Sequence, residues 1–203
     1  MSEDLKIIAL MGIKHCGKTT QGKRLAAFYD CLFFDTDDVI FQQTGKTARE
    51  IYSNSGKDAF MAAESEACKS IVKQLETLRR EHYKMPYAVI STGGGFCNNE
   101  EAKAILKEKS TFVFMKTDEI VAADRIVKEI EIGTNGELKG LPAYIASKKP
   151  KTIEEVRSVF HDFYEERSAL YSAMADIVIE LPQASKEENT QRLINALNKV
   201  RNC

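Results

Sequence analysis

The sequence lacks an excess of charge of either sign. Its 203 residues carry 29 Lys and Arg against 30 Asp and Glu, a formal net charge of −1. A protein that attracts nucleic acid or an anionic membrane through its overall field needs a clear positive balance. We therefore expect neither of these partners, and any phosphate-binding site must be local.

Long apolar runs and a targeting signal are also missing. Residues 1–6 are acidic and lack the basic flank and apolar core of a signal peptide, and no later run approaches the length of a membrane span. The five cysteines are odd in number and scattered, without C-x-x-C pairs for zinc or a disulfide framework. We therefore expect a cytoplasmic protein in a reducing setting.

Short apolar runs alternate with amphipathic stretches along the chain. Buried strands are predicted at 7–11, 31–34, 87–91, 111–115 and 176–180. Helices are predicted at 18–29, 99–109, 117–129 and 185–201, from the capping boxes at Thr47 and Thr152, and from Ser55 to about His82. The alternation predicts a three-layer α/β fold, with a five-stranded parallel sheet flanked by helices.

One segment breaks this alternation. Residues 130–151 contain three glycines and two prolines among polar and lysine residues, and they show no steady period. A loop of this length inside a compact domain is typical of a lid or of disorder. With 43% hydrophobic residues, the chain otherwise suits one domain over 1–203, with a lid insertion at about 130–151.

A phosphate-binding loop follows the first predicted strand. Residues 12–19 match G-x-x-x-x-G-K-[ST] between a buried strand and a helix, the P-loop context. In this motif backbone amides surround phosphate oxygens, Lys18 reaches the outer phosphates and Thr19 ligates Mg²⁺. A glycine turn that merely starts a helix would not explain Lys18 and Thr19. The predicted ATP-binding residues here are Gly12, Lys14, His15, Cys16, Gly17, Lys18, Thr19 and Thr20.

Cys16 lies inside this loop, where nearby amides and Lys18 could lower its thiol pKa and make it sensitive to oxidation. The variable positions of the loop tolerate many side chains. We therefore interpret Cys16 as a tolerated loop residue, with the redox role as the alternative.

Carboxylates follow the second predicted strand, which we expect beside the first. Strand alternation would send Asp35 and Asp37 to one side, with Asp38 as a helix cap. One carboxylate near the metal completes Mg²⁺ coordination, and a second can accept a proton from an attacking hydroxyl. The alternative is that all three merely cap the next helix.

Three consecutive glycines, Gly93, Gly94 and Gly95, follow the third strand. A tight turn needs one glycine or two, whereas three at the ligand-binding edge of a sheet permit close approach of the backbone to a ligand. This loop is predicted to bind substrate.

The chain resembles the shikimate kinase family from residue 7 to about residue 197. The resemblance rests on the phosphate loop, residues 34–37, Thr44-Gly45, Phe60 followed by Glu64, residues 93–95, and residues 167–171 followed by Ala175-Asp176. It implies transfer of the ATP γ-phosphate to a hydroxyl of shikimate, in aromatic amino acid biosynthesis, by a Mg²⁺-dependent enzyme that is usually monomeric.

The resemblance also implies roles for individual residues. Asp35 would lie near Mg²⁺, Asp37 would bind the acceptor hydroxyls and act as the base, and Lys18 would serve catalysis. Gly94 and Gly95 would contact substrate, Arg167 would pair with its carboxylate, and Arg125 would lie against adenine. The alternative for Arg167 is a surface ion pair with Glu165 or Glu166.

Two positions depart from the family pattern. The family carries an arginine after the phenylalanine that matches Phe60, where this chain has Met61, and a lid arginine before a proline, where it has Leu141. Methionine cannot replace a bidentate arginine on a carboxylate. Lys139 or Lys128 could supply the missing charge.

These departures leave other functions open. One is a kinase of the same fold acting on another small metabolite, such as a sugar acid or a nucleotide. Against a nucleotide acceptor, residues 130–155 contain no arginine. Another is an ATP-binding regulatory protein without phosphotransfer, although retention of Lys18 and Asp37 argues against it.

Overall fold

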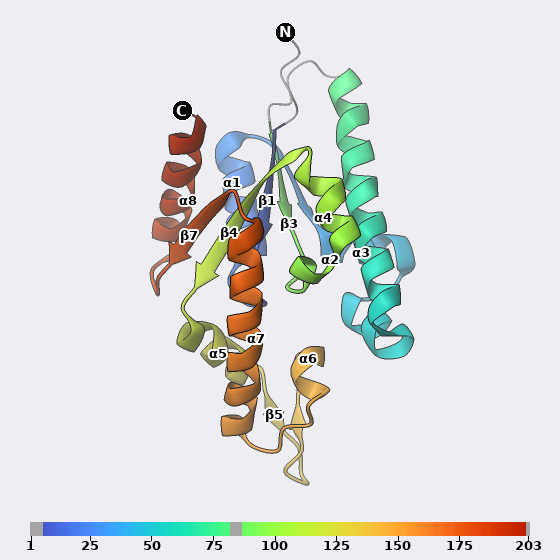
Figure 1. Ribbon diagram of the computed structural model, residues 1–203, viewed down its shortest axis with the longest axis vertical. Helices are drawn as coiled ribbons and strands as arrows, with labels where there is room; N and C mark the ends of the chain where they lie inside the picture. The colour runs from blue at the N-terminus through green and yellow to red at the C-terminus, as the bar shows by residue number, and fades with distance from the viewer. Residues whose placement is uncertain (1–5, 82–86, 202–203) are drawn as a thin grey trace.

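A computed structural model describes residues 6–81 and 87–201, and its main feature is a five-stranded parallel sheet. The order across the sheet is β2-β3-β1-β4-β7, and every neighbouring pair is parallel. Figure 1 shows the strands running toward the end of the molecule where β5 and α6 lie. The strands are β1 (Lys6–Met11), β2 (Leu32–Asp35), β3 (Tyr87–Ser91), β4 (Ser110–Thr117) and β7 (Ile177–Leu181).

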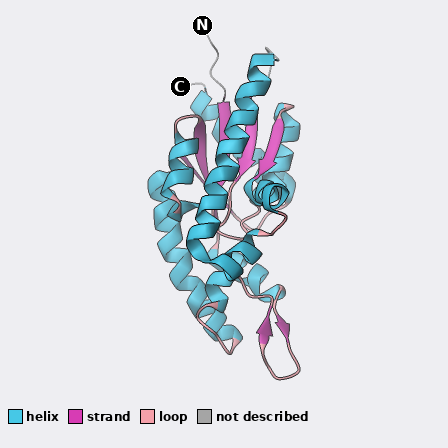
Figure 2. Ribbon diagram, turned by 90° about the vertical axis from the view of Figure 1, so that its right-hand side faces the viewer, coloured by secondary structure: helices cyan, strands magenta, loops and turns pink. Residues whose placement is uncertain are grey.

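Helices cover both faces of this sheet (Figure 2). They are α1 (Lys18–Tyr29), α2 (Thr36–Thr44), α3 (Ala48–Glu81), α4 (Glu100–Lys107), α5 (Glu119–Lys128), α6 (Ala143–Ala146), α7 (Ile153–Met174) and α8 (Lys186–Arg201), with a 3₁₀ turn at Phe96–Asn98. The predicted three-layer α/β fold is confirmed. No helix within the described ranges is long and apolar enough to cross a bilayer.

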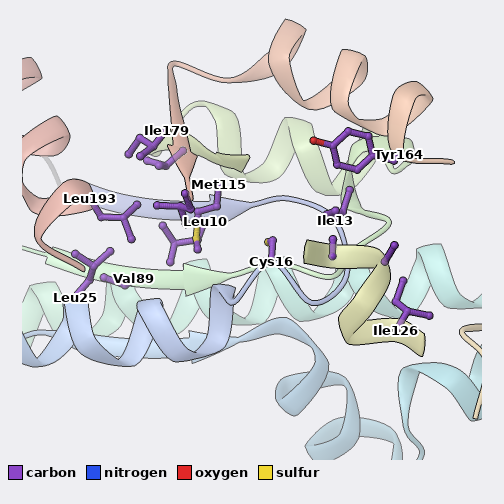
Figure 3. Close-up of a cluster of buried hydrophobic side chains, with 14 of the residues drawn as sticks. Leu10, Ile13, Cys16, Leu25, Val89, Met115, Ile126, Tyr164, Ile179 and Leu193 are labelled. Atoms are coloured by element: carbon purple, nitrogen blue, oxygen red, sulfur yellow. The ribbon is translucent and has the colours of Figure 1, made fainter. Parts of the chain in front are cut away.

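The central strand, β1, contributes side chains to the hydrophobic cores on both faces of the sheet, because successive side chains of a strand point to opposite faces. Ile8 and Leu10 pack with residues of α1, α5 and α8, whereas Ile7, Ala9 and Met11 pack with residues of α3 and α4. Figure 3 shows the first cluster, in which Cys16 of the loop lies among side chains such as Leu10 and Met115. With 4% of its surface exposed, Cys16 is a core residue.

Capping boxes begin several helices where the sequence predicts them. The Thr47 hydroxyl accepts from the Glu50 amide and the Glu50 carboxylate accepts from the Thr47 amide, and Ser185 and Glu188 repeat the arrangement before α8. Gly56, with φ of 85°, breaks α3 where the pattern restarts at Ser55. The predicted end of that helix, His82, lies outside the described residues.

Residues 130–151, which we call the lid segment after the prediction, contain short regular elements. The short strands β5 (Glu131–Ile132) and β6 (Leu138–Lys139) pair antiparallel, and α6 follows. A hairpin with two-residue strands is too short to show a period, which explains why the sequence indicated only a loop. Leu141 between the hairpin and α6 is 6% exposed and packs into the core.

Three local predictions were wrong. β2 does not lie beside β1, because β3 lies between them. Strand alternation does not place Asp37, because β2 ends at Asp35 and α2 begins at Thr36; Asp35 caps this helix and Asp38 lies in its first turn. At α5 the cap is Asp118, because Thr117 continues β4.

Candidate active site

The loop between β1 and α1 is built on unusual backbone angles. Gly12 and Gly17 have φ of 152° and 93°, and His15 has φ of 65°. A Cβ at Gly12 would lie 2.9 Å from the Met115 carbonyl oxygen, so only glycine fits against β4. Gly12 therefore lets the loop pack closely against β4, and it does not line the pocket that the loop borders.

Lys18 folds back over this loop. Its ammonium donates to the carbonyl oxygens of Gly12 and Ile13, both at 2.9 Å, and lies 3.6 Å from the Cys16 sulfur. The side chain is 8% exposed. A positive charge is thus held at the start of α1, where the helix dipole also favours an anion.

Thr19 and Asp35 meet beside Lys18. The Thr19 hydroxyl donates to Asp35 Oδ2 at 2.7 Å, while Asp35 Oδ1 accepts from the Asp37 amide at 3.0 Å. The Asp35 carboxylate therefore caps α2 with one oxygen and contacts α1 with the other. A hydroxyl and a carboxylate are oxygen donors of the kind Mg²⁺ prefers, so this pair fits a magnesium site.

Two pockets open at the carboxyl edge of the sheet. We call the first, of about 620 Å³, the loop pocket; it is lined by residues 14–21 with Asp35, Asp37, Ser91, Thr92, Gly94, Arg125, Lys128, Glu129, Leu181, Ala184, Lys186 and Asn189. We call the second, of about 690 Å³, the aromatic pocket; it is lined by Lys14, Asp37, Asp38, Phe41, Gln42, Thr47, Ala48, Arg49, Tyr52, Phe60, Gly93, Gly94, Gly95, Ala143, Tyr144 and Arg167. Both lists contain Lys14, Asp37 and Gly94, so the pockets meet there.

Asp37 stands at this junction. Its side chain is open to the pockets, yet the surrounding protein raises the carboxyl pKa through desolvation, with further increases from Asp35 and Asp38. Lys18 and Lys14 act in the opposite direction. A carboxyl with a raised pKa is a better proton acceptor than an ordinary aspartate once it is ionised.

The glycine loop after β3 packs against both neighbours. A Cβ at Gly94 would lie 2.9 Å from the Lys14 backbone nitrogen, and one at Gly93 would lie 2.7 Å from Glu64 Oε1 and 3.5 Å from Asp37 Oδ1. Neither position has room for a side chain. Two of the three glycines thus hold the phosphate loop and the carboxylates close together, while Gly95 borders the aromatic pocket.

Arg167 lies over two adjacent aromatic rings, those of Tyr144 and Phe163, on the wall of the aromatic pocket. Its guanidinium carbon is 4.5 Å from the Tyr144 ring centroid and 5.1 Å from that of Phe163. Nη1 donates to the Gly94 carbonyl at 3.2 Å, but the buried Nε has no hydrogen-bond partner among residues 6–81 and 87–201. Within the described residues, Arg167 forms no ion pair with Glu165 or Glu166.

Glu64 is a buried carboxylate that the sequence did not mark as functional. It is fully buried, and desolvation raises its pKa to about 7, although a hydrogen bond from Asn99 Nδ2 to Oε2 at 3.0 Å opposes the rise. Glu64 Oε1 has no hydrogen-bond partner in the part of the chain that the structure describes. The spacing of Phe60 and Glu64 indicated a family motif, but nothing in it predicted burial without a cation.

Arg125, Lys128 and Lys139 are the remaining residues that the sequence predicts near the site. Arg125 Nη1 donates to the His15 carbonyl at 2.6 Å and borders the loop pocket. His15 Nε2 lies 3.4 Å from Glu129 Oε2, and burial lowers the pKa of the His15 imidazole. Lys128 lines the loop pocket, whereas Lys139 lines neither of the two pockets.

The site combines a P-loop that ends in Lys18 and Thr19, a carboxylate beside that loop and an adjoining pocket, all at the edge of a parallel sheet. These features define a P-loop kinase. A family model described as shikimate kinase matches residues 14–198. The chain therefore belongs to the shikimate kinase family, which consists of ATP-dependent phosphotransferases, and the resemblance noted from its motifs is confirmed.

Relatives match nearly the whole chain at modest identity. The chain is 27% identical over 201 residues to a shikimate kinase of Dictyoglomus turgidum, covering 97% of this chain and 98% of that protein. It is 28% identical over 195 residues to a shikimate kinase of Bacillus cytotoxicus, covering 96% and 99%.

Solved structures share the fold. Shikimate kinase from Acinetobacter baumannii, in complex with shikimate, superposes with a TM-score of 0.74 at 21% identity, over 97% of this chain and 95% of that one. Shikimate kinase from Bacteroides thetaiotaomicron gives 0.72 at 22%, over 96% and 98%.

Proposed function

We propose that the protein transfers the γ-phosphate of ATP to a hydroxyl of shikimate, giving shikimate 3-phosphate. The observation that carries this proposal is the meeting of the loop pocket and the aromatic pocket at Lys14, Asp37 and Gly94. A phosphoryl donor in one pocket and a hydroxyl acceptor in the other would react at that junction, since transfer needs the two oxygens in line. Family membership supports the choice of acceptor.

On the donor side, amides of residues 14–18 would surround the β- and γ-phosphates. Lys18 would exchange its bonds to the Gly12 and Ile13 carbonyls for bonds to phosphate oxygens. Thr19 and Asp35 would hold Mg²⁺, which when bound neutralises charge that develops on the phosphate oxygens. Arg125, at the rim of the same pocket, would lie against adenine.

On the acceptor side, the aromatic pocket suits a small ring that carries hydroxyls and a carboxylate. Phe60 and Tyr52, whose rings lie 6.2 Å apart, offer apolar contact to ring carbons. Gly94 and Gly95 would contact the acceptor through the backbone. Arg167 would pair with its carboxylate, and the unpartnered Nε is a donor still to be satisfied.

Asp37 would bind the reacting hydroxyl and take its proton as the oxygen attacks phosphorus. Its raised pKa suits this role, and the ionised form is required. Activity is therefore expected to fall as pH drops through the pKa of Asp37. By family analogy the protein would act as a monomer, with residues 130–151 as its lid and without nucleic acid or membrane.

A coupled ADP-release assay with Mg-ATP tests the proposal. Shikimate would be run beside quinate, gluconate and simple nucleoside monophosphates, and turnover with shikimate alone is expected. Turnover only with another acceptor would make the protein a related kinase with a changed substrate. ATP binding without turnover on any acceptor would favour a regulatory ATP-binding protein.

A further inference from the structure

The aromatic pocket contains a second arginine, Arg49, that neither the motifs nor the family pattern marks. Arg49 and Arg167 both line this pocket, and neither forms an ion pair with any described residue. Arg24, in contrast, pairs with Glu187 at 3.0 Å. Two guanidinium groups without carboxylate partners thus border one pocket.

Arg49 is held in place but keeps most of its donors. Its Nη2 donates to the carbonyl oxygen of Leu141 in the lid segment at 2.8 Å. This is the one hydrogen bond its side chain makes within the described part of the chain, whereas a guanidinium offers five N–H donors in a planar fork. The remaining donors are available to a planar anion in the pocket, such as a carboxylate.

The sequence position of Arg49 also favours a bound anion. It is the second residue of α3, and a cation in the first turn of a helix faces the positive end of the helix dipole. A carboxylate in the pocket would offset this repulsion. Because Thr47 and Glu50 already cap the helix, Arg49 is not needed to begin it.

Met61 does not supply the missing contact. Phe60 lines the aromatic pocket, but Met61 is not among its lining residues, and the Met61 carbonyl accepts from Asn99 at 2.8 Å. Leu141, the second departure from the family pattern, buries its side chain in the core and turns its carbonyl oxygen to Arg49. Of the two departures, Leu141 is therefore the one that contacts Arg49.

We propose that Arg49 is a specificity residue that, together with Arg167, recognises the carboxylate of the acceptor. This inference rests on the proposed function and identifies a side chain that binds the carboxylate of the acceptor. Arg167 is tied to Gly94 at the junction of the pockets, and Arg49 is tied to the lid segment. A carboxylate bound by both would leave the hydroxyl-bearing part of the ring toward Asp37.

The test compares Arg49→Ala, Arg49→Lys and a control, Lys46→Ala, which removes a nearby exposed charge outside both pockets. Initial rates would be measured at saturating ATP with shikimate and with its neutral carboxamide. For Arg49→Ala we expect KM for shikimate to rise about tenfold to 100-fold, the loss typical of a charge-assisted hydrogen bond, with little change in kcat. Arg49→Lys should lie between, and Lys46→Ala should match the wild-type protein.

The carboxamide separates recognition from a merely structural role. If Arg49 reads the negative charge, Arg49→Ala should change KM for the carboxamide far less than KM for shikimate. Equal losses on both substrates would mean that Arg49 acts only by holding the lid segment, and would overturn the inference, as would an unchanged KM for shikimate. If the wild-type protein binds ATP but does not turn over shikimate, the proposed function itself fails.

Discussion

The Thr19 hydroxyl donates to the Asp35 carboxylate at 2.7 Å and so connects the helix that follows β1 with the end of β2, although β1 and β2 are not neighbours in the sheet. Thr19 lies on α1, which follows β1, and Asp35 ends β2, with β3 between these strands in the sheet. The bond therefore bridges the carboxyl edge of β3. It brings together the two oxygen ligands proposed for Mg²⁺.

Asp35→Asn should raise the Mg²⁺ concentration that gives half-maximal activity by roughly tenfold or more. Asparagine retains an oxygen to cap α2 but loses the charge that attracts a cation. Rates would be measured against Mg²⁺ at fixed ATP, with Asp38→Asn as the control, because Asp38 does not line the loop pocket. Equal Mg²⁺ requirements in wild type and Asp35→Asn would exclude Asp35 as a ligand.

Lys18→Ala should abolish phosphotransfer, with a loss of about 100-fold or more in kcat, because removal of one preorganised charge at the transferring phosphate costs that much. The variant also loses two hydrogen bonds to loop carbonyls, so thermal unfolding would be measured beside the rate. Lys23→Ala is a matched control on the same helix and outside the loop pocket. A fully folded Lys18→Ala with normal kcat would contradict the donor-site assignment.

Asp37→Asn should spare ATP binding and remove turnover, because asparagine keeps the shape of the side chain but cannot accept the hydroxyl proton. ATP affinity would be measured by calorimetry and turnover by ADP release. Reduced ATP affinity would contradict the division of roles between Asp35 and Asp37. The wild-type rate should also decline at acidic pH, since protonation of Asp37 removes the base and its pKa is raised.

The sheet and its helices were predictable because their signals are local. An apolar run such as residues 7–11 needs burial on both faces, and α1 was predicted with its observed bounds, Lys18–Tyr29. The strand order was not predictable in this way. The position of β3 between β2 and β1 depends on contacts between residues 81 positions apart (β1 with β3) and 56 positions apart (β2 with β3), and no local pattern records these.

The candidate site divides along the same line. The phosphate loop, Asp37, the glycine loop and Arg167 lie in recognisable motifs, and the structure places all of them around two adjoining pockets. Arg49 was missed because it stands inside a capping box, where Thr47 and Glu50 explained the local pattern. The only signal in the sequence was a cation in the first turn of a helix.

Met61→Arg should lower KM for shikimate several-fold, because the longer side chain would restore the arginine of the family pattern, although Met61 itself does not line the aromatic pocket. Met61→Lys adds the charge without the planar fork and should give a smaller gain. Initial rates against shikimate concentration would provide the comparison. An unchanged KM in Met61→Arg would mean that the residue at position 61 does not reach the acceptor.

Glu64→Gln should remove a pH dependence from the stability of the fold. The pKa of Glu64 is raised from 4.5 to about 7 by burial, so between these pH values the folded protein holds a proton that the unfolded chain releases. The contribution of Glu64 is therefore most favourable below pH 4.5 and is lost as pH rises to 7. Above that, the buried charge costs about 3 kcal/mol, an order-of-magnitude figure.

Urea unfolding of wild type and Glu64→Gln from pH 5 to 8 checks this expectation. As pH rises, the unfolding free energy of wild type should fall relative to that of Glu64→Gln, because the neutral amide never ionises. The difference between the two proteins should level off above about pH 8. Glu66→Gln, on the exposed side of the same helix, should show a difference that does not vary with pH. A constant difference for Glu64→Gln would mean that Glu64 titrates as an ordinary glutamate, with a cation or water at Oε1.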